Sequence, residues 1–258
     1  MPKRRRLDEE LVARGLFASR DEAMRAVLAG DVSGAGFRFS SPGQQVPPGC
    51  ELHVRAPRAH VSRGAEKLQA ALDAFAIDPA GKTCLDVGCS TGGFTQLLLE
   101  RGAARVDAVD VGYAQFAWSL RNDPRVVLHE RTNICDLPFA ENAPDPVDLA
   151  VCDVSFTSAT SVLGAVRALL KDGGSFVVLV KPQFEAPAAA VGEGGVVRDA
   201  AVRLAAVERV ADALNGCGLA VQGWVPSPIK GAKGNQEHLL FAKEGACARP
   251  LSLTVRDA

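Results

Sequence analysis

The segment TCLDVGCSTGGFTQLLLE, residues 83–100, decides the fold of this chain. Its apolar start predicts a buried strand over residues 83–88, and the closely spaced glycines that follow predict a tight loop. The run FTQLLLERG then predicts a helix over residues 94–102. A strand, a glycine loop and a helix in this order let backbone N–H groups approach a ligand closely.

Apolar runs of strand and helix character alternate downstream of this segment. Apolar strands separated by helices are typical of a parallel sheet covered on both faces. We therefore predict an α/β fold, a doubly wound Rossmann-like domain in which a late pair of strands lets a seventh strand enter antiparallel. The predicted strands are 105–111, 125–130, 147–156, 175–180, 220–225 and 237–242, and the predicted helices are 114–121, 158–170 and 199–216.

The N-terminal residues predict a separate small α+β domain. Residues 7–13 and 20–29 carry helical apolar stripes, and Ser19 with Glu22 forms a capping box between them. A stretch rich in Gly, Ser and Pro then predicts turns and short strands, ending in a strand over residues 51–55. We place the domains at 1–57 and 62–258, with a linker at 58–61 that Pro57 introduces.

Composition limits the class of protein. The 258 residues are 47% hydrophobic and 23% charged, and no apolar run approaches the roughly 18 residues that span a bilayer. The start MPKRRRLDEE lacks the apolar segment of a secretory signal. We expect a soluble, cytoplasmic protein with no membrane association.

The cysteines and histidines predict neither a metal site nor a disulfide framework. The seven cysteines are scattered and never form a CxxC pair, and the four histidines are equally dispersed. Cys84 and Cys152 lie in apolar strands, where we expect small buried hydrophobic residues. Cys89 lies in the glycine loop, and we favour a space-filling role for it over that of a nucleophile.

The charge of the chain is unevenly distributed. Residues 1–60 hold ten Lys and Arg against seven Asp and Glu, and the remainder holds nineteen against twenty-three. The overall charge of −1 therefore conceals a basic N-terminal part. This part is the candidate for binding a polyanion.

The glycine loop alone leaves the ligand open. Asp86 precedes the first glycine, and the spacing departs from the dinucleotide fingerprint, which favours the amino and sulfonium charges of S-adenosylmethionine over the pyrophosphate of NAD. Asp110, at the end of the second strand, would accept hydrogen bonds from the ribose of either ligand. A purely structural glycine turn is the third interpretation.

Four charged residues are candidates for chemistry on a hydroxyl group. Asp153, Lys181 and Glu237 lie at strand ends where open α/β sheets bind ligands, and Lys67 lies just before the first strand. Two amines near each other and near a sulfonium disfavour their ammonium forms, which makes Lys181 the candidate base. The alternative interpretations are a solvated helix residue for Lys67, an edge-strand charge for Glu237 and a helix cap for Asp153.

The sequence resembles the TlyA family of S4-domain rRNA 2′-O-methyltransferases, whose catalytic domain is related to the FtsJ methyltransferases. The segments that carry the resemblance are RLDEELVARGLFASRDEA, VSRGAEKL, LDVGCSTGGFT, DVGYAQFAWSLRNDPRV, ERTN, DVSF, LVKPQFE, GEGGVVRD and GNQEHLLF. The resemblance implies a monomeric, S-adenosylmethionine-dependent enzyme acting on rRNA in ribosomal subunits, with cytidine ribose in 16S rRNA, 23S rRNA or both as its target. It also implies a catalytic tetrad of Lys67, Asp153, Lys181 and Glu237.

The resemblance implies a cofactor pocket and an RNA-binding surface as well. The expected pocket residues are Asp86, Gly88, Ser90, Gly92, Gly93, Phe94, Asp110 and Asn133, with Asp136 as a second candidate against the adenine. The expected phosphate contacts of the S4-like domain, which position RNA without reading its sequence, are Arg4, Arg5, Arg6, Arg20 and Arg25. Residues 32–38 depart from the usual S4 turn, and His60 stands where the family linker often has an aromatic residue.

Three other classes of function predict different properties. An NAD-dependent oxidoreductase would bind NAD and not S-adenosylmethionine. A non-catalytic RNA-binding or ribosome assembly factor would not need the intact tetrad. A direct haemolysin would need a spanning or strongly amphipathic segment, which the sequence does not offer.

Overall fold

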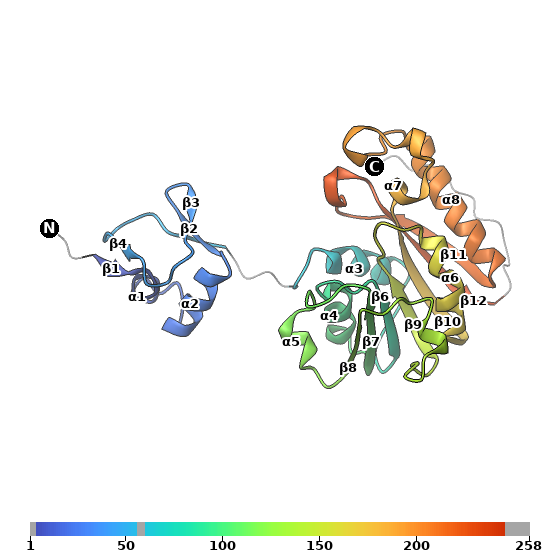
Figure 1. Cartoon of the computed structure of the whole chain (residues 1–258), viewed down its shortest axis with the longest axis horizontal. Coiled ribbons are helices and arrows are strands. Elements are labelled where there is room, and N and C mark those ends of the chain that lie inside the picture. Colours follow the sequence, from blue (N-terminus) through green and yellow to red (C-terminus); the bar gives the residue numbers. More distant parts are fainter. Residues whose placement is uncertain (1–3, 56–59, 246–258) are drawn as a thin grey trace. The chain divides into compact units, whose positions relative to one another are not determined.

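The computed structural model of the chain describes residues 4–55 and 60–245. The chain divides into two compact units, residues 1–59 and 60–258 (Figure 1), and each is described by itself. Residues 58 and 59 of the predicted linker, the preceding Pro57 and the segment 246–258 lie outside the described residues.

The first unit packs two helices against short antiparallel strands. Helix α1 spans Leu7–Ala13 and helix α2 spans Arg20–Leu28, close to the predicted ranges. The strands are β1 (Arg5–Arg6) paired with β4 (Gln45–Val46), and β2 (Val32–Gly34) between β3 (Phe37–Arg38) and β5 (His53–Val54). The buried core consists of Leu7, Leu11, Ala23, Val27, Val32, Phe39 and Val46.

The predicted capping box closes differently in the structure. The Ser19 hydroxyl accepts a hydrogen bond from the Glu22 backbone N–H at 3.3 Å, as a capping serine does. The Glu22 carboxylate, however, accepts from the backbone N–H of Ala18 at 3.1 Å, one residue before the expected Ser19. The helix therefore begins where predicted, and the glutamate holds the preceding loop.

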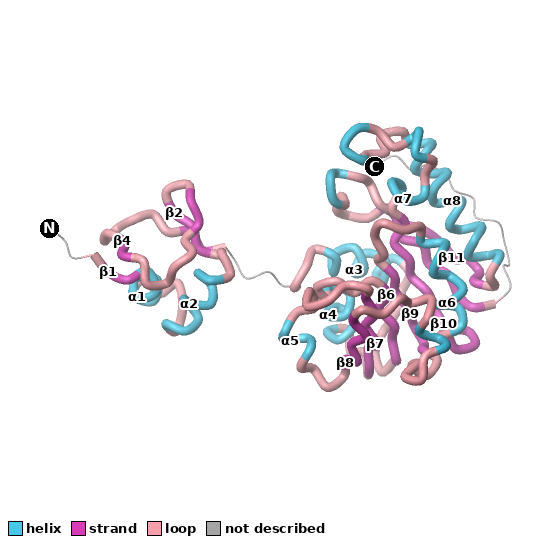
Figure 2. Tube along the Cα trace, in the orientation of Figure 1, coloured by secondary structure: helices cyan, strands magenta, loops and turns pink. Residues whose placement is uncertain are grey.

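The second unit contains one seven-stranded sheet covered by helices on both faces (Figures 1 and 2). The strand order is β11-β12-β10-β9-β6-β7-β8. Strands β8, β7, β6, β9 and β10 are parallel, and β12 is antiparallel to both β10 and β11. The α/β fold class and the antiparallel strand are thus confirmed. The bounds are β6 Thr83–Val87, β7 Arg105–Asp110, β8 Val126–Glu130, β9 Val147–Cys152, β10 Leu170–Val180, β11 Leu219–Pro226 and β12 His238–Glu244.

Alternation along the strands builds a separate apolar core on each face of this sheet. In β9, Leu149 and Val151 face the core under the first helices, while Ala150 and Cys152 face the opposite core. Cys84 and Cys152 are fully buried, and burial raises the pKa of each thiol to about 12. The helices are α3 Gly64–Ala74, α4 Gly93–Glu100, α5 Trp118–Arg121, α6 Leu163–Ala168, α7 Pro182–Glu185 and α8 Ala200–Gly216.

Four predicted elements have wrong bounds. The strand predicted at 175–180 already begins at Leu170. The helix predicted at 114–121 begins only at Trp118, because Ala114 has a left-handed φ of 59° and donates its N–H to the Glu130 carboxylate. The helix predicted at 158–170 is a 3-10 turn, Ala159–Val162, followed by the short α6. The strand predicted at 147–156 ends at Cys152, so the DVSF segment is a loop. None of the helices in residues 4–55 and 60–245 combines the length and the apolar character that a membrane span requires.

Candidate active site

A cavity of about 240 Å³ opens at the carboxyl ends of the central strands. Its lining comes from the start of α3, the glycine loop after β6, and the residues after β9, β10 and β11. Strand β7 lies on one side of β6, and β9 lies on its other side. The strand order therefore reverses at β6. Such a switch point is where open α/β sheets bind ligands.

Lys181 and Asp153 form the first charged pair in this cavity. The buried strand β10 leads directly to Lys181, and the following Pro182 keeps that residue extended at the start of α7. The Lys181 Nζ lies 2.6 Å from the Asp153 carboxylate and donates to the Ser155 hydroxyl at 2.6 Å. Only 8% of Lys181 is exposed, so its amine lies away from bulk water. The Asp153 and Ser155 oxygens hold it there.

Lys67 and Glu237 form the second pair. Lys67 extends from the first turn of α3, and its Nζ lies 2.6 Å from the Glu237 carboxylate just before β12. Glu237 is 2% exposed, and a Cβ on Gly231 would overlap its carboxylate. A glycine at 231 is therefore required for the carboxylate to stand where it does.

The structure brings all four charged residues together. Lys67, Asp153 and Lys181 line the cavity, and Glu237 reaches it through its contact with Lys67. Each of the two amines therefore has one carboxylate as its partner. None of the alternative interpretations describes these contacts, since Lys67 is paired, β12 is an internal strand and Ser158, not Asp153, caps the next turn.

The glycine loop is fixed by hydrogen bonds from its own backbone. The N–H groups of Gly88 and Cys89 donate to the Val109 carbonyl at 2.9 and 3.2 Å. The Asp110 carboxylate accepts from the N–H of Ser90 at 2.8 Å and of Gly112 at 2.6 Å. Gly88 has a left-handed φ of 81°, and a Cβ there would stand 2.9 Å from the Asp153 carbonyl. The loop can therefore approach β9 only with glycine at this position.

Asp86 lies fully buried beneath this loop. One carboxylate oxygen accepts from the Thr95 hydroxyl at 2.6 Å, and among the described residues the other oxygen has no partner. Burial raises the pKa of this carboxyl to about 7. A buried oxygen without a donor is costly unless a ligand supplies one. An ammonium group such as that of S-adenosylmethionine would be such a donor.

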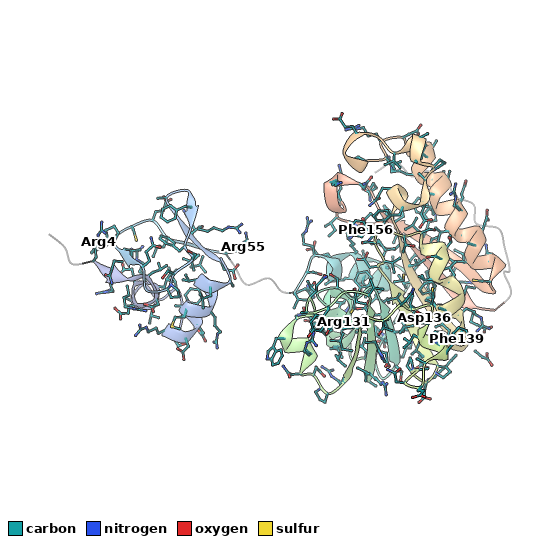
Figure 3. All side chains as sticks on the ribbon, viewed as in Figure 1. Arg4, Arg55, Arg131, Asp136, Phe139 and Phe156 are labelled. Atoms are coloured by element: carbon teal, nitrogen blue, oxygen red, sulfur yellow. The ribbon has the colours of Figure 1, made fainter. Side chains whose placement is uncertain are left out.

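The structure divides the remaining predicted cofactor residues. Ser90, Gly93 and Phe94 line the cavity together with Gly88, whereas Asp86, Gly92 and Asp110 lie behind or beside it. Asn133 and Asp136 are exposed outside the lining, and the Asn133 side chain accepts from the Cys135 N–H at 3.0 Å. Figure 3 shows Asp136 well apart from Phe156, which follows the cavity residue Ser155.

The five predicted RNA-binding arginines are not equivalent. Arg5 pairs with Glu10 at 3.1 Å, while Arg6 and Arg20 pair with Asp8 at 2.8 and 3.0 Å. These two arginines hold the pKa of the Asp8 carboxyl at about 2, with the hydrogen bond from Arg6 as the largest cause. Arg4 and Arg25 are exposed and have no partner within the residues described. Three of the five therefore also stabilise the start of α1.

Sequence reasoning missed two residues that build this site. Ser155 holds Lys181, and its only sequence signal is a hydroxyl two residues after the acid at the end of a strand. Glu185 is 3% exposed and accepts from the Ser158 hydroxyl and the Ala159 N–H, both at 2.6 Å. It ties the loop after β9 to the short helix after Lys181, so both supports of the Lys181 amine are fixed.

The fold and the site together define a class of protein. Five parallel strands, an antiparallel β12 beside β10 and a glycine loop after β6 are the architecture of an α/β methyltransferase. Residues 60–244 match the family described as FtsJ-like methyltransferase. The chain belongs to this family and, within it, to the TlyA methyltransferases.

Sequence and structural similarity extend over nearly the whole chain. A Mycobacterium tuberculosis protein named 16S/23S rRNA (cytidine-2′-O)-methyltransferase TlyA is 48% identical over 245 residues, 94% of this chain and 91% of that protein. A solved Streptococcus thermophilus structure, named a hemolysin, is 37% identical with a TM-score of 0.70, covering 96% of this chain and 90% of its own. A Listeria monocytogenes structure described as an S-adenosylmethionine-dependent methyltransferase shares the fold alone, at 19% identity and a TM-score of 0.51, covering 71% and 99%.

These similarities confirm the predicted membership in the TlyA and FtsJ-like methyltransferases and the prediction that the chain is an enzyme. They favour neither an oxidoreductase nor a non-catalytic assembly factor. The Streptococcus thermophilus structure carries the name hemolysin, and this name describes that protein.

Proposed function

We propose that this protein transfers a methyl group from S-adenosylmethionine to the ribose 2′-hydroxyl of a cytidine in 16S rRNA, 23S rRNA or both. The observation that carries the proposal is the convergence of two lysine–carboxylate pairs in one cavity beside the glycine loop. The substrate is supported by the name of the relative that is 48% identical over 94% of this chain.

Lys181 is the proposed base. A neutral amine has two N–H groups and one lone pair; this nitrogen donates to the Ser155 hydroxyl, and the Asp153 carboxylate lies 2.6 Å from it. The lone pair is then left for the cavity, where it takes the proton as the 2′-oxygen forms its bond to carbon. The proton would stay on Lys181 Nζ, and the bound cofactor would supply the methyl group and retain the electron pair of the sulfur–methyl bond. The pair of Lys67 and Glu237 holds the hydroxyl from a second side.

The glycine loop and the acids around it would hold the cofactor, which supplies an electrophilic methyl group when bound. Asp86 offers its unpartnered oxygen to the ammonium group. Asp110 already accepts two backbone hydrogen bonds, and a carboxylate has about four lone-pair sites, so ribose hydroxyls can share it. Asn133 or Asp136 is the proposed contact of the adenine.

We also infer that residues 1–57 form an S4-like RNA-binding domain. Among the described residues, Arg4 and Arg25 are exposed without a carboxylate partner, and the exposed sides of Arg5, Arg6 and Arg20 add to the basic surface. A monomer in the cytoplasm, where ribosomal subunits are found, fits this function. The linker at 58–61 joins RNA binding to the catalytic unit.

The test is methylation of purified ribosomal subunits with labelled S-adenosylmethionine, followed by ribose-methyl mapping. Lys181→Ala should lower the rate by about 10²–10⁴-fold, the usual contribution of a positioned base. The matched control is Lys171→Ala, at the other end of β10, where the amine pairs with Asp148 at 2.7 Å. Methyl transfer unaffected by Lys181→Ala would refute the proposed base, and binding of NAD in place of S-adenosylmethionine would refute the proposed cofactor.

A further inference from the structure

Two loops of the catalytic unit form a basic edge beside the cavity. They span residues 192–198 and 229–235, and their exposed cations are Arg198, Lys230 and Lys233, called here the basic lip. Lys230 lines the cavity itself, next to the Gly231 that contacts Glu237. The lip is therefore continuous with the site that holds the four charged residues.

Asn235 locks the two loops together. It is 1% exposed, its side-chain oxygen accepts from the Val197 N–H at 2.9 Å, and its amide donates to the Gly195 carbonyl at 2.8 Å. Its backbone carbonyl also accepts from the Gly231 N–H at 2.9 Å. One buried side chain thus fixes both loops, so the lip is a built surface.

The backbone of the lip is strained at one of its cations, Lys233. Lys233 has a left-handed φ of 63°, which is unfavourable for a residue with a side chain. A Cβ on Gly195 would stand 3.7 Å from the Lys233 Nζ, so this amine lies over the glycine backbone of the facing loop. Strain that is kept in a folded loop is typical of functional surfaces.

The cations of the lip have no anion within the described residues. Five arginines elsewhere in this unit are paired with carboxylates, namely Arg101, Arg105, Arg121, Arg125 and Arg167, whereas Arg63, Arg131, Arg203 and Arg209 form no such pair among the described residues. The side chains of Arg198, Lys230 and Lys233 form no such pair, and Glu193 is the one carboxylate carried by residues 192–198 and 229–235. The lip therefore has an excess of positive charge that a ligand can neutralise.

We infer that the basic lip binds the phosphodiester backbone of the RNA strand that carries the methylated ribose. This inference rests on the proposed RNA substrate. A ribose in the cavity has a phosphate on each side, and Lys230 is the lip residue that reaches the cavity wall. The sulfonium cofactor is itself cationic and would be repelled by this charge, so a polyanion is the ligand that fits it.

The test compares two double variants of the full chain with S-adenosylhomocysteine bound. Arg198→Gln with Lys233→Gln removes the two charges of the lip that lie outside the cavity lining. The control, Lys171→Gln with Lys243→Gln, removes two charges at the far end of the sheet. Lys243 lies opposite Ser175 in the register of β12 and β10, whereas His238, at the other end of β12, lies opposite Val180 beside the site. Affinity for purified ribosomal subunits is measured over a series of salt concentrations.

The lip variant should bind subunits about tenfold or more weakly, with a slope of log affinity against log salt reduced by about 0.7–0.9 per lost contact. Its affinity for S-adenosylhomocysteine and its melting temperature should equal those of the wild type. An unchanged salt slope, or an equal loss of subunit affinity in the control, would overturn the inference. An unchanged slope would indicate that the lip contacts a ribosomal protein. If the wild type binds subunits but transfers no methyl group, the proposed function fails. The comparison of salt slopes still shows in that case whether the lip binds RNA phosphates.

Discussion

Replacing Asp86 by Asn should stabilise the free protein at alkaline pH while weakening its cofactor binding. The carboxyl is fully buried with one oxygen unpartnered, and burial raises its pKa from 3.8 to about 7. An asparagine keeps the acceptor for the Thr95 hydroxyl and removes the charge. It also removes the anion that we propose for the ammonium group of S-adenosylmethionine.

The size and direction of the effect follow from the pKa of Asp86. Between pH 3.8 and 7 the unfolded chain loses this proton while the folded protein keeps it, so stability falls as the pH rises and levels off above 7. At 1.36 kcal/mol per pKa unit, the whole shift corresponds to a loss of about 4 kcal/mol in the free energy of unfolding. About 2–3 kcal/mol of this loss falls between pH 5 and pH 8. The amide does not titrate, so the free energy of unfolding of the Asn variant rises by this amount relative to wild type between pH 5 and pH 8.

The assay is urea unfolding of both proteins at pH 5 and pH 8, with titration of S-adenosylhomocysteine at pH 8. Any difference in packing between the side chains is the same at both pH values, so the change with pH isolates the charge. Loss of a charge-assisted hydrogen bond should weaken ligand binding about 10–100-fold. The control is Asp212→Asn, at an exposed acid of α8. A stability difference that does not grow from pH 5 to pH 8 would refute the reasoning.

Three shorter predictions concern other contacts. Ser155→Ala should lower kcat about 10–100-fold at unchanged affinity for S-adenosylhomocysteine, because the Lys181 amine loses one of its two supports; Ser155→Thr, which keeps the hydroxyl, should restore most of the rate. Gly231→Ala should displace the Glu237 carboxylate and lower methyl transfer with a measurable loss of melting temperature, whereas Gly216→Ala, with open space around it, should not. Asp8→Asn should destabilise the N-terminal unit at pH 7, seen as faster hydrogen exchange in α1. Since the folded pKa of Asp8 is lowered to about 2, this difference should disappear as the pH falls through that value.

The sheet was predictable because its signal is local. Each central strand is an apolar run bounded by turn residues, and the glycine loop fixes where β6 ends and α4 begins. The helix predicted at 114–121 was wrong because a distant residue decides its start. Glu130 accepts the Ala114 N–H, and this contact sixteen residues away leaves Ala114 in a left-handed conformation. Helical periodicity carries no information about such a contact.

The site was predictable where a topological rule applies. Residues directly after buried parallel strands meet at one edge of the sheet, which brought Asp153 and Lys181 together. Lys67 precedes the sheet, so only the family resemblance pointed to its contact with Glu237. Ser155 and the basic lip follow no strand-end rule, because irregular loops and one buried side chain, Asn235, determine where they lie.

The distribution of charge explains how an acidic catalytic unit can handle RNA. Residues 61–258 hold nineteen Lys and Arg against twenty-three Asp and Glu, which opposes a polyanion over long distances. At physiological salt, charges are screened beyond roughly 8 Å, so the groups nearest the ligand dominate its binding. The four central residues hold two carboxylates against two amines and so carry no excess of positive charge, and the lip cations have no carboxylate partner among the described residues. A centre without excess positive charge admits a sulfonium, and the basic edge attracts a phosphate, so cofactor and RNA can occupy neighbouring places without competing for the same charges.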